Sequence, residues 1–211
     1  GEREKAPYFV GNATVMMLIC GAVLLVVTQI FLTPLLKLFG SPAEVLPLAE
    51  EYVRITSLGF PFMIITTGGG HLIRADGNPK MTMVCNLLGA GINTVLDALF
   101  VLGFDWKMSG AAWATVIGQV ISGTVAIVCI ARYKTVCLEA KHLRIRWQYT
   151  SRIIAIGMAS FFNQIAMMVV QIAMNNLLKH YGALSVFGES IPIAVSGIVM
   201  KINQITFSIV I

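Results

Sequence analysis

The chain has 211 residues, of which 57% are hydrophobic and 12% are charged, with a formal net charge of +5 and a mean hydropathy of +0.82. Soluble globular domains carry about 25% charged residues, so this composition excludes an ordinary soluble domain and indicates a chain whose solvent is lipid. The positive charge does not indicate a nucleic-acid interface, because the basic residues lie mainly in short connectors and not on one face.

Long apolar runs predict six membrane-spanning helices, and no β pattern is visible. A helix needs about 20 apolar residues to cross about 30 Å of hydrocarbon. The runs lie at about residues 9–38, 47–73, 81–102, 109–131, 153–178 and from 183 onward. Because the chain begins without Met and is still apolar at Ile211, we expect it to be an internal fragment of a longer protein.

The basic residues near the ends of the runs predict the orientation. One side of the membrane would hold ten of them and the other side three: Arg3, Lys5, Arg74, Lys80, Arg132, Lys134, Lys141, Arg144, Arg146 and Arg152 against Lys37, Lys107 and Lys179. Cytoplasmic loops carry an excess of Lys and Arg. We therefore expect a multi-pass protein of the cell membrane, with the connector over residues 132–152 in the cytoplasm.

Asp97 lies deep in the third run, and Asn93 is four residues earlier, on the same helix face. An ionised carboxylate in mid-membrane costs at least about 2.5–3.5 kcal/mol, so it should face a cavity or a partner. A carboxylate beside an amide can ligate Na⁺, and burial favours the protonated form that a proton-coupling group needs. The alternative is a structural hydrogen bond between helices.

Other polar residues within the apolar runs each allow two interpretations, one functional and one structural. Gln164, Gln171 and Asn175 share one face of the fifth run and form either the wall of a polar cavity or hydrogen bonds between helices. Tyr52 either lines a pore or is an interfacial aromatic. The sequence holds no Ser/His/Asp, HExxH or paired-carboxylate constellation and no Cys/His metal spacing, so nothing supports an enzyme or a metal site beyond Na⁺ at Asp97.

Four stretches together resemble the multidrug and toxic compound extrusion (MATE) family. They are Phe39-Gly-Ser-Pro42 followed by Ala49-Glu-Glu-Tyr52-Val-Arg-Ile55 and Gly59-Phe-Pro-Phe62; Ile73-Arg-Ala-Asp-Gly77-Asn-Pro79; Asn93-Thr-Val-Leu-Asp97-Ala-Leu-Phe100; and Gly110-Ala-Ala-Trp-Ala-Thr115. The resemblance implies an all-α protein of twelve helices in two six-helix lobes, of which this chain would hold about the third to the eighth. Residues 1–132 would be part of the N-terminal lobe, 133–152 the cytoplasmic connector and 153–211 the start of the C-terminal lobe.

The resemblance also implies a site and a function. The N-lobe cation site of the family matches Asn93, Asp97 and Thr115, and Tyr52 matches a tyrosine that borders the same cavity. The family's first-helix acid is absent, and the stretch from Gly157 to Met167 lacks the acid that some members use for Na⁺.

The expected function is export of drugs or organic cations by alternating access, coupled to H⁺ or Na⁺, without a cofactor. We expect a monomer in membrane lipid that binds no nucleic acid. The alternatives are a lipid-linked precursor flippase of the same superfamily, whose cationic residues would be Arg54 and Lys201, or a non-transport membrane protein.

Overall fold

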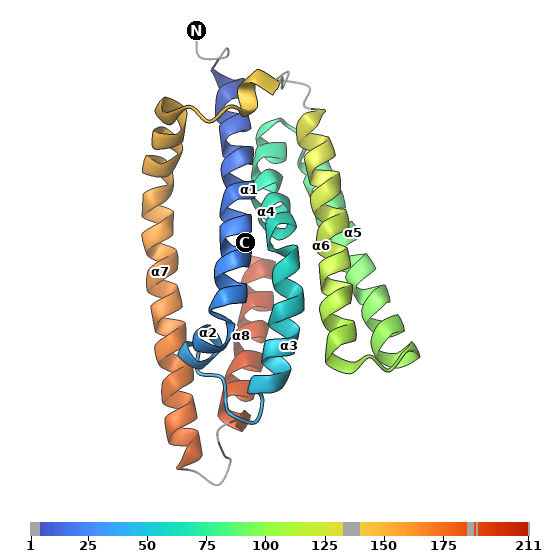
Figure 1. The fold of residues 1–211 in the computed structure, drawn as a ribbon, viewed down its shortest axis with the longest axis vertical. Helices are drawn as coiled ribbons and strands as arrows, with labels where there is room; N and C mark the ends of the chain where they lie inside the picture. Colours follow the sequence, from blue (N-terminus) through green and yellow to red (C-terminus); the bar gives the residue numbers. More distant parts are fainter. Residues whose placement is uncertain (1–4, 133–139, 185–187, 189, 211) are drawn as a thin grey trace. The chain divides into compact units, whose positions relative to one another are not determined.

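The computed structural model describes residues 5–132, 140–184, 188 and 190–210, and over these residues the chain is helical without a strand (Figure 1). The α-helices are α1 (Ala6–Ile30), α2 (Leu32–Leu38), α3 (Leu46–Thr56), α4 (Phe60–Ala75), α5 (Pro79–Asp97), α6 (Lys107–Ala131), α7 (Trp147–Ala183) and α8 (Ser190–Val210). Two short 3₁₀ turns, Ser57–Gly59 and Ala140–Leu143, and a π-helical segment, Ala98–Gly103, complete the described structure. The predicted all-α class is confirmed.

Among the described residues, four helices are long and apolar enough to cross a membrane. They are α1, α5 with its π-helical extension, α6 and α7. The predicted second span is not one continuous helix, because the 3₁₀ turn at Ser57–Gly59 separates α3 from α4. Pro61 explains this division: it has no N–H to continue a helix, but it is tolerated in the first turn of α4, where N–H groups have no partner. The predicted sixth span corresponds to α8, which begins at Ser190.

The first predicted span is also divided. α1 ends at Ile30, and α2 begins at Leu32 with Pro34 in its first turn. The fifth span is longer than predicted, since α7 takes in the last six residues of the connector expected over 132–152. Residues 133–139 of that connector lie outside the described residues. The helix therefore begins within the predicted connector, and the division of the chain at residue 152 stays a prediction.

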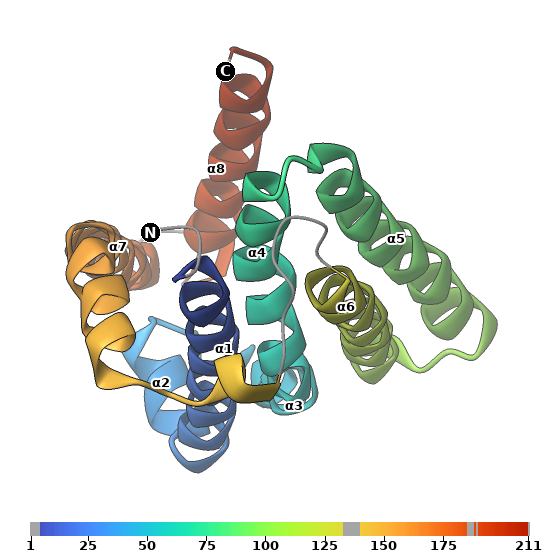
Figure 2. The same cartoon turned by 90° about the horizontal axis from the view of Figure 1, so that it is seen from above.

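The chain divides into two compact units, residues 1–32 with 51–159 and residues 33–50 with 160–211. In the first unit α4 lies between α1 and α6, and α5 lies against α6 (Figure 2). Its buried core combines α4 with α6, and four partly buried side chains pack against it: the core is Ile65, Ile73, Ala126 and Ile130, and its neighbours are Val10, Met17, Met81 and Cys129.

The end of the connector is fastened to α1. Asn12, which is fully buried, donates from Nδ2 to the Tyr8 carbonyl oxygen (2.7 Å) and accepts at Oδ1 from the Arg146 backbone N–H (2.8 Å). Gly11 lies against the His142 carbonyl so closely that a Cβ would collide with it. These contacts hold the start of α7 to the start of α1, within the first unit.

In the second unit α7 supplies donors to the end of α2. Asn176 Nδ2 donates to the Leu38 carbonyl oxygen (3.0 Å), and Lys179 Nζ donates to the Ser41 carbonyl oxygen (3.0 Å). The last carbonyl groups of a helix have no partner within it. Polar side chains of α7 therefore satisfy the C-terminal end of α2.

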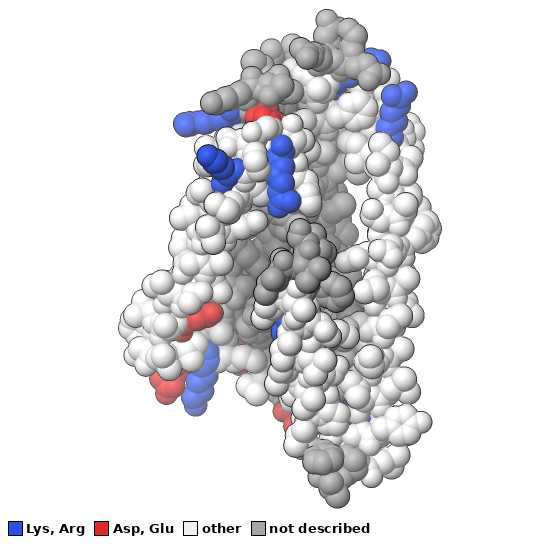
Figure 3. All heavy atoms as spheres, turned by 180° about the vertical axis from the view of Figure 1, so that it is seen from behind, with Lys and Arg blue, Asp and Glu red and all other residues white. Residues whose placement is uncertain are grey.

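Basic side chains gather at one end of the first unit. Figure 3 shows most of the visible Lys and Arg side chains at the upper end, where α1 begins and α6 ends. This is the side on which the sequence places ten of the basic residues near span ends. The asymmetry agrees with the predicted orientation, which no further observation tests.

Candidate functional site

Glycines let α5 and α6 approach closely. A Cβ at Gly118 of α6 would lie 2.9 Å from the Gly89 carbonyl oxygen of α5, and one at Gly89 would lie 2.9 Å from the Cβ of Ser122. Real side chains do not tolerate such distances without a shift of the backbone. The absence of side chains at these two positions therefore brings the polar residues of the two helices within hydrogen-bonding reach.

Two of the predicted cation-site residues meet across this contact. Asn93 of α5 donates from Nδ2 to Thr115 Oγ1 of α6 (3.2 Å), and the Thr115 hydroxyl donates to the Ala111 carbonyl oxygen (2.9 Å). Both side chains are half-buried. The side-chain oxygen of Asn93, Oδ1, accepts no hydrogen bond from another described residue, so it remains available to a ligand.

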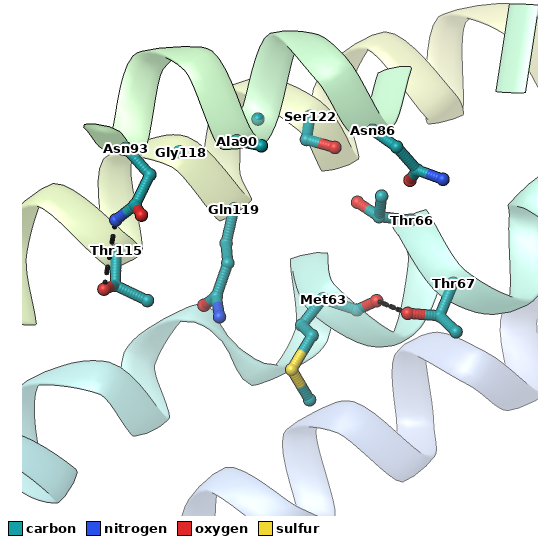
Figure 4. Close-up of a pocket in the computed structure, with 11 residues that line it drawn as sticks. Met63, Thr66, Thr67, Asn86, Ala90, Asn93, Thr115, Gly118, Gln119 and Ser122 are labelled. Atoms are coloured by element: carbon teal, nitrogen blue, oxygen red, sulfur yellow. Dashed lines mark hydrogen bonds between the residues drawn. The ribbon is translucent and has the colours of Figure 1, made fainter. Parts of the chain in front are cut away.

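The pair lines a cavity of about 270 Å³ between α4, α5 and α6 (Figure 4). The lining consists of Met63, Thr66 and Thr67 from α4, Asn86, Gly89, Ala90 and Asn93 from α5, and Thr115, Gly118, Gln119 and Ser122 from α6. None of these side chains is charged. The cavity therefore offers hydroxyl groups, amides and one thioether, which suit a ligand with both polar and apolar parts.

Asp97 lies one turn beyond Asn93, at the end of α5, where the helix passes into the π-helical segment Ala98–Gly103. The residue is half-buried, and its Oδ1 atom is buried without a hydrogen-bond partner among the described residues. Asp97 does not line the 270 Å³ cavity. A buried carboxylate oxygen without a partner is costly, and such atoms are rare in folded proteins.

The sequence reading missed Gln119. It lines the cavity one turn after Thr115, and its Oε1 atom is also buried without a hydrogen-bond partner among the described residues. Its side chain packs against Gly59 of the 3₁₀ turn, where a Cβ would collide with it. Thr115, Gln119 and Ser122 are spaced at i, i+4 and i+7, which places all three on one helix face. This spacing is visible in the sequence and could have predicted Gln119 as a lining residue.

The four residues predicted to line a substrate cavity lie elsewhere among the described side chains. Tyr52 is half-buried on α3 and Gln164 is exposed on α7. Gln171 Nε2 donates to Asn175 Oδ1 (3.0 Å), and Asn175 Nδ2 donates to the Phe39 carbonyl oxygen (3.2 Å). The Asn175 bond joins α7 to the residue that follows α2, and whether Asn175 lines a cavity stays a prediction.

The oxygen atoms near this cavity suit a hard monovalent cation or a proton. Carboxylate, carbonyl and hydroxyl oxygens are the ligands that hard cations take. The described residues hold no group of three or more His, Cys, Asp or Glu side chains that could hold a metal ion. Any cation here would be bound by one carboxylate with neutral oxygens.

The fold and the cavity together define a class, an all-helical integral membrane protein with a polar binding cavity inside its bundle. Comparisons with known proteins show what the chain is similar to. Residues 1–99 match the MatE family model. The chain is 30% identical over 173 residues to the multidrug export protein MepA of Staphylococcus aureus (strain MSSA476). This match covers 81% of this chain and 38% of that protein. The chain is thus similar to the MatE family and to a multidrug export protein, which confirms the resemblance that its motifs predicted.

Solved structures agree with this similarity at the level of the fold. An outward-facing conformation of a multidrug resistance MATE family transporter of the MOP superfamily matches with a TM-score of 0.72 and 22% identity, over 84% of this chain and 40% of that one. An inward-facing conformation matches with a TM-score of 0.69 and 20% identity, over 82% and 45%. The chain thus spans less than half the length of the proteins that it matches.

Proposed function

We propose that the full-length protein is an antiporter that exports drugs or other organic cations by alternating access and is driven by inward movement of H⁺ or Na⁺. The similarity to a multidrug export protein supports export of small organic molecules. The chain spans 38% of that relative, so the proposal concerns the whole protein and not this segment alone. The same proposal assigns residues 1–132 to the N-terminal lobe, 133–152 to a cytoplasmic connector and 153–211 to the C-terminal lobe of a multi-pass cell-membrane protein.

The buried carboxylate oxygen of Asp97 carries the proposal. It has no hydrogen-bond partner among the described residues, while Asn93 and Thr115, one turn away, hold each other in place. Within a membrane such a group is stabilised by a proton or by a cation. The Asn93 carbonyl oxygen and the Thr115 hydroxyl oxygen are suited to complete the shell of Na⁺. Gln119 Oε1, which also has no hydrogen-bond partner among the described residues, is a further neutral oxygen ligand for a cation.

The neighbouring cavity has the chemistry for an organic cation. Its lining is uncharged, with amides, hydroxyl groups and Met63, and a positively charged substrate is attracted by the negative charge of Asp97. Binding of H⁺ or Na⁺ removes that attraction, so the ion and the substrate compete. An ion drives export only as far as its affinities for the inward-open and outward-open states differ.

A flippase for a lipid-linked precursor fits the cavity less well. A diphosphate needs cationic groups, and the described lining contains neither Lys nor Arg. Arg54 and Lys201 are exposed side chains that do not line this cavity. A non-transport membrane protein would give no reason for an unpartnered carboxylate oxygen beside the Asn93–Thr115 pair.

The test is export of a lipophilic cationic dye by the full-length protein in inside-out vesicles with an imposed proton or sodium gradient. We expect uptake into the vesicles to follow one of the two gradients and to fall at least tenfold in Asp97→Asn. Asp105→Asn is the matched control, because Asp105 is exposed in the loop before α6 and its φ of 53° is one that Asn adopts readily.

Unchanged gradient-driven uptake in Asp97→Asn would remove Asp97 from the mechanism. Dye uptake that is equal with and without both gradients would contradict coupled transport altogether. Loss of uptake in both variants would point to general damage and not to the carboxylate.

A further inference from the structure

A second, smaller pocket lies where α1 and α7 begin. It has a volume of about 120 Å³ and is lined by Lys5, Gln148, Tyr149 and Arg152. Pockets for drug-sized molecules are about 300–1,000 Å³, so this one suits a single small group. It lies outside the cavity between α4, α5 and α6, and transport by the proposed mechanism makes no use of it.

The pocket is held by a fixed framework. The Tyr149 ring stacks on Tyr8 of α1, with centroids 5.3 Å apart and planes 6° from parallel, and the Arg146 guanidinium lies 4.6 Å above the Tyr8 ring centroid. Asn12 accepts hydrogen bonds from the Arg146 backbone N–H and, at 3.4 Å, from the Thr150 hydroxyl. These contacts fix the start of α7 against α1 and so fix the spacing of the pocket walls.

Among the residues that the structure describes, the pocket lining carries positive charge and no negative charge. Lys5 and Arg152 are exposed, and neither side chain forms an ion pair or a hydrogen bond with another described residue. No carboxylate from residues 5–132 or 140–184 lines the pocket, and the first turns of α1 and α7 contain no acidic residue. Tyr149 and Gln148 add a hydroxyl and an amide as neutral donors. This set of groups recognises a phosphate.

The position of the pocket is that of a lipid headgroup. α1 and α7 are both long and apolar enough to span a membrane, so we expect their first turns to lie near one membrane surface. Trp147, at the start of α7, is 77% exposed, as expected of an interfacial aromatic, and Ile156 further along the helix is 81% exposed. Figure 3 shows basic side chains over the first turns of α7, above this apolar surface.

We propose that the pocket formed by Lys5, Gln148, Tyr149 and Arg152 binds the phosphate of an anionic phospholipid headgroup. The acyl chains of the lipid would lie along the exposed apolar surface of α7, which a free phosphate ion does not use. Basic pockets between membrane helices are suited to anionic headgroups. Because the pocket joins α1 to the start of α7, the bound lipid holds the end of the connector to the first unit.

The experiment measures lipid binding to the purified full-length protein in detergent, from the shift of its thermal unfolding midpoint. The probes are dioctanoyl phosphatidylglycerol, dioctanoyl phosphatidylcholine and inorganic phosphate, each titrated separately. The variants are Lys5→Gln with Arg152→Gln, and the control Arg74→Gln with Lys80→Gln. The control removes the same charge from exposed positions at the same end of the first unit, outside the pocket.

We expect phosphatidylglycerol to stabilise the wild type and the control at lower concentration than phosphatidylcholine. In the Lys5→Gln, Arg152→Gln variant the affinity for phosphatidylglycerol should fall about 25-fold, because each base near an anionic headgroup contributes about fivefold. Arg152→Lys should retain most of the affinity. If the double variant is not recovered folded, Arg152→Gln alone should show a loss of about fivefold.

Three outcomes would overturn the proposal. Equal losses in the pocket variant and the control would mean general surface electrostatics. Stabilisation by inorganic phosphate as strong as that by phosphatidylglycerol would mean a site for free phosphate. Equal affinity of the wild type for the two lipids would mean no headgroup selectivity. None of these results bears on dye export, so this proposal and the proposed function fail independently.

Discussion

Individual oxygen atoms decide what the cavity can bind. Thr115 contributes one oxygen that accepts from Asn93 Nδ2, and this bond turns the Asn93 carbonyl away from Thr115. Asp97 and Gln119 each contribute a buried oxygen with no hydrogen-bond partner among the described residues. A cation bound among these groups would satisfy at least two atoms that the protein itself leaves without partners.

Thr115→Val tests this arrangement at one residue, since it removes the hydroxyl and preserves the β-branched shape. The Thr115 hydroxyl orients the Asn93 side chain, whose oxygen would bind the ion. Loss of this hydrogen bond costs about 1–1.5 kcal/mol, so the affinity for the coupling ion should fall about tenfold. Ion binding by the purified full-length protein is the measurement. Thr124→Val is the control, because Thr124 is exposed on the same helix and bonds only to the Val120 carbonyl oxygen. A tenfold loss in the control as well would refute the assignment.

At this scale the sequence predicted some residues and missed others. Asn93 and Asp97 were predicted from their spacing on one helix face and Thr115 from the family resemblance, and the structure brings Asn93 and Thr115 together. Gln119 was missed because it belongs to no motif; its role depends on the close packing of Gly59, which sequence periodicity does not reveal. Whether Gln171 and Asn175 line a cavity remains a prediction.

Among the elements, the contact between α1 and the start of α7 is the most constrained. Asn12 is fully buried, and its side chain forms hydrogen bonds with Tyr8, Arg146 and Thr150. Removal of one partner from a buried polar network leaves the others unsatisfied, at about 1–3 kcal/mol for each group. The start of α7 is therefore expected to move with α1.

Asn12→Ala should lower the free energy of unfolding by about 3 kcal/mol and expose the amides of residues 146–150 to hydrogen exchange. Both quantities are measured on the full-length protein, by thermal or denaturant unfolding and by exchange mass spectrometry. Ser151→Ala is the control, because its hydroxyl is exposed and has one long bond of 3.5 Å to the Gln148 carbonyl oxygen. It should change stability by no more than about 0.5 kcal/mol. If the amides of residues 146–150 remain protected from exchange in Asn12→Ala, Asn12 does not hold the start of α7 against α1.

The boundaries of the elements were the least predictable feature. Hydropathy identified the apolar runs, but it did not divide α3 from α4, because Ser57, Leu58 and Gly59 are compatible with a continued helix. The division depends on Pro61 and on the close approach of Gly21 to the backbone of Pro61, whose Cα would lie 2.5 Å from an added Cβ. Such contacts come from distant parts of the chain and leave no local pattern.

For the whole molecule, the proposed function depends on exchange between two states. The match to inward-facing and outward-facing structures concerns the fold, and each match covers less than half of the solved chain. The described cavity lies within the first unit. The proposal is that binding of the ion alters the balance between the two states, which requires a measurable affinity of the site for the ion.

The most direct test of the account is the number of coupling ions that the purified full-length protein binds, measured as proton release on titration or as radioactive sodium retained. The wild type and Asp105→Asn should bind one more H⁺ or Na⁺ per molecule than Asp97→Asn. Equal ion binding by Asp97→Asn and the wild type would contradict the claim that the buried carboxylate of Asp97 is the coupling site.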